Sequence, residues 1–222
     1  MKKLGQEIDL LVNYPRANRD LAARLESKSE ESRAIAREFE FDYFDGDRSH
    51  GYGGFHYSQK FWKPVIPSIV GTYQINGLSA VLDVGCAKGF FLYDLQQEIP
   101  GISVKGIDIS KYAIENAKPE VQEFLSVANA KDLPFKDSSF DFVISINTVH
   151  NLSREDCAIA LQEIERVSRG HSFITVDAYR NDAEKARMEA WNLTALTMMA
   201  VDEWKEFFLE VGYSGDFYWF IP

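Results

Sequence analysis

The chain has 222 residues, 45% of them hydrophobic and 14% aromatic, a composition typical of a globular protein with a substantial core. Its formal net charge of −10 argues against broad electrostatic binding to nucleic acid or anionic membrane, because such binding needs clustered Lys and Arg. No apolar run approaches the roughly 20 residues of a membrane helix, and the two cysteines, Cys86 and Cys157, indicate a reducing compartment. We therefore expect a soluble, cytoplasmic protein.

Residues 1–77 are predicted to form a helical cap followed by a segment rich in glycine and aromatic residues. The first 40 residues favour helix, with Ser27 or Ser29 as an N-cap before residues 30–39. The glycine-aromatic segment predicts a lid over a ligand, in which Arg48, Tyr52 and Tyr57 make contacts. The alternative is a connector whose aromatic rings seal the core.

The stretch 79–95 predicts a nucleotide-binding turn. An apolar strand over residues 79–84 stops at the small-residue turn 85–89, and helical periodicity begins at Phe90. Glycines allow a close approach of the backbone to a ligand, and free N–H groups at the helix start face it. Asp83 lies two residues before Gly85, which distinguishes the pattern from the G-x-G-x-x-G turn of nicotinamide dehydrogenases.

Three further strands follow in order. The second, residues 102–108, ends on Asp108, which is well placed to accept hydrogen bonds from ribose hydroxyls, with Ile109 as an apolar platform for a base. The third, about residues 123–127, leads into Asn129 and Ala130. The fourth, residues 139–146, ends on Ile146.

These motifs, D-x-G-x-A-x-G first among them, resemble those of the class I S-adenosylmethionine (SAM) methyltransferases over roughly residues 80–177. The resemblance implies SAM as the cofactor and places Asn129 where the family has an acidic residue that binds the adenine amino group. An amide carbonyl can accept the same bond. The predicted cofactor-binding residues are Asp83, Gly85, Cys86, Gly89, Asp108, Ile109, Asn129, Ala130, Ile146, Arg48 and Tyr52.

The remaining elements complete a core predicted over residues 78–222. They are a helix from a cap at Ser153 through Val167, a strand over 171–177, a helical excursion over 181–199, a helix over 201–211 closed by Gly212 and a strand over 217–221. Alternating strands and helices predict an α/β fold: a Rossmann-like, doubly wound, mainly parallel sheet with an N-terminal helical cap. The resemblance implies seven strands, the last one antiparallel.

The candidate catalytic residues follow strands, where ligands of such sheets bind, or lie in the lid. His150 is predicted as a general base, with packing or backbone bonding as the alternative. Arg180 either grips an anionic acceptor or pairs with Asp182 or Glu184, and Tyr57 is the third candidate. The four histidines and two cysteines have no metal-ligand spacing, so no metal is expected.

The leading hypothesis is a SAM-dependent methyltransferase acting on a small polar acceptor, preferably at oxygen. The stretch D-G-D-R-x-x-G-Y-G-G-F at residues 45–55 resembles a bacterial methyltransferase group of surface-polysaccharide (capsule or lipopolysaccharide) pathways. Two alternatives stay open: aminopropyl transfer from the same cofactor site, and a non-catalytic SAM-binding subunit. The expected partner is a small-molecule acceptor that can be anionic, with no nucleic acid and no membrane; the sequence leaves the oligomeric state open.

Overall fold

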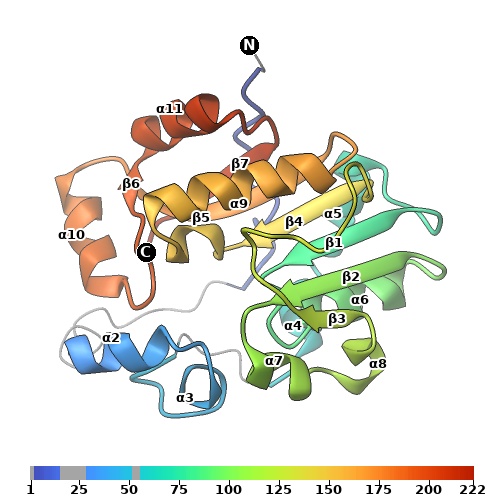
Figure 1. Cartoon of the computed structure of the whole chain (residues 1–222), viewed down its shortest axis with the longest axis horizontal. Coiled ribbons are helices and arrows are strands. Elements are labelled where there is room, and N and C mark those ends of the chain that lie inside the picture. Colours follow the sequence, from blue (N-terminus) through green and yellow to red (C-terminus); the bar gives the residue numbers. More distant parts are fainter. Residues whose placement is uncertain (1–2, 16–28, 52–55) are drawn as a thin grey trace.

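The computed structural model describes residues 3–15, 29–51 and 56–222, and its centre is one seven-stranded sheet (Figure 1). The strand order is β3-β2-β1-β4-β5-β6, and β7 pairs with β5. Every pairing between these strands is parallel, which confirms the predicted Rossmann-like, doubly wound architecture. The strands are β1 (Ala80–Val84), β2 (Ser103–Asp108), β3 (Leu125–Val127), β4 (Phe142–Ile146), β5 (Ser172–Tyr179), β6 (Met199–Ala200) and β7 (Asp216–Phe220).

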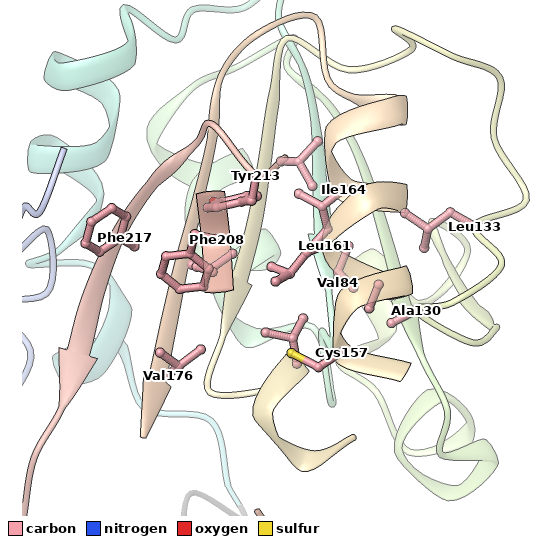
Figure 2. Packing of buried hydrophobic residues seen from close by; sticks show 14 of the residues in the cluster. Val84, Ala130, Leu133, Cys157, Leu161, Ile164, Val176, Phe208, Tyr213 and Phe217 are labelled. Atoms are coloured by element: carbon pink, nitrogen blue, oxygen red, sulfur yellow. The ribbon is translucent and has the colours of Figure 1, made fainter. Parts of the chain in front are cut away.

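Helices cover both faces of the sheet because successive residues of a buried strand point to opposite sides. In β1, Leu82 packs in the core cluster beneath α9 (Arg154–Val167) and α11 (Val201–Val211). Val81 belongs to the cluster on the other face, beneath α5 (Ile66–Tyr73) and α6 (Phe90–Glu98). Figure 2 shows Leu161 and Ile164 of α9 among the residues of the first cluster.

The last strand differs from the prediction. β7 runs parallel to β5, with Phe173 opposite Asp216 and Asp177 opposite Phe220. It follows α11 after the turn at Gly212, whose φ is 78°. A helix between two neighbouring strands makes a crossover that joins parallel strands, whereas an antiparallel neighbour usually follows a hairpin.

The N-terminal segment is only partly helical. Residues 3–15 form no helix; Ile8 N donates to Phe217 O at 3.0 Å and Phe217 N donates to Gln6 O at 3.0 Å, so this segment pairs with β7. Residues 16–28, which belong to the first 40 residues predicted to favour helix, lie outside the described residues. The predicted helix from Glu30 is confirmed as α2 (Glu30–Ala36), capped by Ser29, whose hydroxyl accepts from Ser32 N. Short helices α3 (Phe41–Phe44) and α4 (Gln59–Trp62) follow.

The remaining elements lie close to their predicted positions. Ser153 caps α9 by accepting from Asp156 N, as its motif predicts. The predicted excursion is helical only in α10 (Asp182–Trp191), and an irregular turn leads from it to β6. Shorter pieces lie at the strand ends: α7 (Lys111–Glu115), α8 (Pro119–Gln122) and the 3₁₀ helix η1 (Val149–Asn151). In Figure 1, α2 and α10 lie on the side toward which the arrows of β1, β2 and β4 point.

Candidate cofactor and acceptor site

A cavity of about 560 Å³ opens at the carboxyl ends of β1, β2 and β4. Its walls come from the core and from the described part of the N-terminal cap. Strand order reverses between β1 and β4, and in open α/β sheets this switch point is where ligands bind. The cavity is therefore the candidate site for both cofactor and acceptor.

The glycine turn after β1 forms the floor of the cavity. Gly85 has a φ of 86°, and a Cβ on it would lie 2.2 Å from Thr148 Oγ1 in the segment after β4. Only glycine fits both this conformation and this close approach. Gly89, with a φ of 73°, is the N-cap of α6.

Four amides of this turn bond within the protein. Gly85 N and Cys86 N both donate to Ile107 O, at 2.8 and 2.9 Å, and Gly89 N donates to Cys86 O. Ala87 N donates to Asp108 Oδ2 at 2.8 Å. The turn thus contributes shape and close approach, and its own hydrogen bonds hold it rigid.

Asp108 stands at the end of β2, beside the glycine turn. Its Oδ1 accepts from Ser110 N at 2.9 Å, and its Oδ2 accepts from Ala87 N. Each carboxylate oxygen has a second lone pair, so two ribose hydroxyls can still donate to it. Burial raises the pKa of Asp108, while the N–H groups of Ser110 and Ala87 oppose the shift.

Asp83 is a second buried carboxyl in the cavity wall. Burial, with the negative charge of Asp108 as a smaller cause, raises the pKa of Asp83 to about 8. Burial likewise raises the pKa of the Cys86 thiol, with Asp83 and Asp108 adding to the shift. A ligand with a positive charge near Asp83 would favour its ionised form.

The residues predicted to surround the adenine all line the cavity. Ile109 is 52% exposed there, as an apolar platform must be. Asn129 Oδ1 accepts from Lys131 N at 3.0 Å and keeps one lone pair for a ligand amino group. Ala130 and Ile146 complete this part of the wall.

An ion pair joins the cap to the glycine turn. Lys88 Nζ lies 2.6 and 2.5 Å from the two carboxylate oxygens of Asp45, which follows α3. Tyr112 of α7 donates its hydroxyl to Asp45 Oδ2 at 2.6 Å, and this bond raises the pKa of Tyr112 to about 12. Burial opposes ionisation of Asp45, but the bonds from Lys88 and Tyr112 dominate and lower its pKa. We call Asp45, Lys88 and Tyr112 the cap latch.

His150 lines the cavity, but its geometry does not support the predicted role of general base. Its Nδ1 accepts from Asp177 N at 3.1 Å, and its Nε2 lies 3.6 Å from Asp177 Oδ1. Burial lowers its pKa although Asp177 opposes the shift, so the imidazole is neutral near pH 7. With Nδ1 as acceptor the proton sits on Nε2, and no lone pair is left for an acceptor hydroxyl.

Three other predicted contacts differ in the structure. Tyr57 lies outside the cavity wall: its hydroxyl donates to Asp94 Oδ1 at 2.5 Å and its ring packs edge-on against Tyr93. Burial, then the bond to Asp94, raises the pKa of Tyr57, so it is no proton acceptor at neutral pH.

Arg180 and Arg48 do not line the cavity either. Arg180 Nη1 lies 3.5 Å from Glu184 Oε1, the pairing that the sequence offered as the alternative, and its side chain is half exposed. Arg48 is exposed in the turn after α3. Tyr52 lies outside the described residues, whereas the neighbouring His56 and Ser58 line the cavity.

The sequence did not single out several residues that line the cavity. Lys88 sits inside the glycine motif, but its partner is 43 residues away, so no local pattern reveals the latch. Arg37 lies at the end of α2 and has no motif around it. Aromatic rings form much of the wall; those not singled out include Phe39, Tyr43, Phe61, Trp62 and Phe220.

These observations match the shape and chemistry of an adenosyl cofactor. A close backbone approach at Gly85, a carboxylate with open lone pairs at Asp108 and an apolar platform at Ile109 are gathered in one cavity. Among the described residues, no group of three or more His, Cys, Asp or Glu side chains could hold a metal ion. No helix within those residues has the length and apolar character needed to cross a membrane.

Comparison with known proteins shows which protein family part of the chain resembles. Residues 82–176 match the family described as "Methyltransferase domain". The chain is 33% identical over 57% of its length to a tRNA (carboxymethyluridine(34)-5-O)-methyltransferase of Arabidopsis thaliana, covering 30% of that protein. It is 29% identical over 73% of its length to the 2-methyl-6-phytyl-1,4-hydroquinone methyltransferase of Synechocystis, covering 54% of that protein.

A solved structure agrees on the fold. The YcgJ protein of Bacillus subtilis superimposes with a TM-score of 0.55 at 21% identity, with 66% of each chain covered. The chain spans about half or less of the length of the first curated relatives, so they leave its own acceptor open. The matched segment is similar to a methyltransferase domain, and the cofactor of that family is S-adenosylmethionine.

Proposed function

We propose that this protein transfers a methyl group from SAM to an oxygen of a small polar acceptor. The observation that carries the proposal is the single cavity in which Asp108 and the Gly85 turn face the segment after β4. When bound, SAM supplies a methyl group already activated by its positive sulfonium. The chain has to hold the acceptor oxygen in line with that methyl group and keep water out.

Each part of the cavity wall has a task in this proposal. Asp108 binds the ribose, and Ile109 and Asn129 bind the adenine. The Asp45–Lys88 ion pair holds the cap on the glycine turn, so that cap residues form part of the cavity wall. The aromatic rings exclude water from the acceptor side. No residue has to remove a proton if the acceptor oxygen is already anionic, and this fits His150, whose Nδ1 lone pair already accepts from Asp177 N.

The acceptor we propose is a sugar- or phosphate-type metabolite of a bacterial surface-polysaccharide pathway. Its support is the resemblance of residues 45–55 noted in the sequence and the aromatic wall of the cavity, since ring faces can pack against a sugar. The relatives named above act on tRNA and on a hydroquinone, so they do not point to one acceptor.

Calorimetric titration with S-adenosylhomocysteine tests the cofactor part. Asp108→Ala should weaken binding at least about tenfold, because it removes hydrogen bonds to a charged acceptor. Asp137→Ala is the control. Asp137 is exposed, pairs with Arg166 and precedes β4, whereas the cavity lies at the carboxyl end of that strand. Equal affinity of parent and Asp108→Ala would overturn the cofactor assignment, and tighter binding of NAD would favour a dehydrogenase.

A further inference from the structure

The inference concerns Arg37 and rests on the proposed function. Arg37 follows α2 as its C-cap residue and lines the cavity. Its Nε is buried without a hydrogen-bond partner. Within the described ranges Arg37 forms no ion pair, whereas Arg33, one turn earlier on the same helix, pairs with Glu30.

The only Lys side chain of the described cavity wall is already paired with a carboxylate. Lys88 is held by both carboxylate oxygens of Asp45. The carboxylate of Asp108 accepts two backbone N–H groups, and Asp177 faces the ring of His150. The guanidinium of Arg37 is thus the uncompensated positive charge of the described wall, and a planar guanidinium matches carboxylate or phosphate oxygens.

A second polar atom lacks a partner on the same cavity. Asn151 Oδ1 is buried without a hydrogen bond, while its Nδ2 donates to Asn147 O at 3.2 Å. An amide oxygen in that state is suited to accept from a hydroxyl or N–H group of a ligand. Aromatic rings, Phe39 and Trp191 among them, form the apolar parts of the wall.

We infer that the methyl acceptor is a hydroxylated organic anion, such as a sugar phosphate or a uronate, whose anionic group binds Arg37. If its anionic oxygen is the nucleophile, an oxygen lone pair forms the new O–CH₃ bond. The S–CH₃ bond breaks and its electron pair returns to sulfur, so one negative and one positive charge are neutralised. No proton is released in that case.

Binding to the protein saturated with S-adenosylhomocysteine tests the inference. The probes are glucose 1-phosphate and glucuronate, with glucose as the neutral comparison, measured by calorimetry. The parent should bind at least one of the two anions and bind glucose more weakly. Arg37→Gln should weaken anion binding about tenfold or more, Arg37→Lys should weaken it less, and Arg33→Gln, with the same charge change on the same helix, should leave it unchanged.

Affinity for the cofactor product separates the possible failures. Arg37→Gln should bind S-adenosylhomocysteine like the parent, which also shows that the variant is folded. Failure of the parent to bind either anion, or unchanged anion binding by Arg37→Gln, would overturn the inference. The inference would also be overturned if Arg37→Gln lost binding of S-adenosylhomocysteine but kept binding of 5′-methylthioadenosine. Arg37 would then bind the carboxylate of the methionine part of the cofactor. If the parent binds no S-adenosylhomocysteine, the proposed function itself fails.

Discussion

Burial makes ionisation of the Asp83 carboxyl unfavourable in the folded protein. Its carboxyl is buried beside Asp108, and its pKa of about 8 in the folded protein stands far above the ordinary 3.8. Folded protein therefore holds this proton up to about pH 8, while the unfolded chain releases it near pH 4. Stability contributed by this group falls as the pH rises through that window, and the full cost is present above it.

Asp83→Asn should therefore stabilise the protein free of cofactor, and increasingly so at higher pH. We expect a gain in the free energy of unfolding of about 1–3 kcal/mol at pH 8, shrinking toward zero near pH 4, because a neutral amide avoids the buried charge. Urea unfolding of both proteins across this range measures the difference. A gain that does not depend on pH would show that ionisation of Asp83 is not its cause.

His150 stabilises the end of β5 by accepting a hydrogen bond from Asp177 N. His150→Ala should lower the free energy of unfolding by about 1–3 kcal/mol, because the buried Asp177 N–H loses its acceptor. Once an acceptor is known, turnover well below the melting temperature should change less than about tenfold, since general-base assistance is typically worth ~10²–10⁴. A loss in that larger range, with unchanged cofactor affinity, would restore His150 as the base.

At the scale of elements, the cap latch should hold α3 against the glycine turn. Asp45→Asn removes the partner of a buried ammonium, so the free energy of unfolding should fall by about 2–4 kcal/mol. Asp47→Asn is the matched control two residues away: Asp47 is exposed and accepts a local hydrogen bond from Ser49 N. Urea unfolding compares the three proteins. Equal losses of unfolding free energy in the two variants would mean that the cap latch does not stabilise the fold.

The elements of the core were predictable because their causes are local. Gly85 needs a left-handed backbone and a missing Cβ, and both demands are met within one short motif. Asp108 ends its strand at a fixed distance from that turn because β1 and β2 pair in register, with Val84 opposite Ile107. Strand ends and the residues after them therefore follow from the alternation of strands and turns.

The cap was predicted less well because its placement depends on contacts far along the chain. Asp45 meets Lys88 and Tyr112, which lie 43 and 67 residues away, and residues 6–8 pair with Phe217 near the C-terminus. Tyr57 and Arg180 were predicted as catalytic residues because their side chains suit the chemistry and lie in segments expected near the carboxyl edge of the sheet. Their hydroxyl and guanidinium instead contact Asp94 and Glu184. The sequence offered Glu184 as an alternative partner of Arg180, but no spacing rule singled out Asp94.

At the scale of the whole molecule, one cavity is shared by cap and core. Lys88 and Asp108 belong to the core, Arg37 belongs to the cap, and all three line it. A ligand that contacts both parts and binds only the folded state stabilises them together. The described part of the cap and the core should then unfold as one cooperative unit when the site is filled.

Thermal unfolding with S-adenosylhomocysteine tests this coupling. At about 100 times its dissociation constant the ligand should add about 2.7 kcal/mol, which corresponds to a rise of about 5–10 °C in Tm for a domain of this size. Near-ultraviolet circular dichroism, which follows the packing of the aromatic rings in cap and core, and far-ultraviolet circular dichroism, which follows the whole backbone, should give the same Tm. Asp108→Ala should lose about half of the rise or more at that same ligand concentration, because its affinity is at least about tenfold weaker, whereas Asp137→Ala should keep the rise. Two separate transitions, of which only the later one shifts with ligand, would show that the cap unfolds independently and that the core alone binds the cofactor.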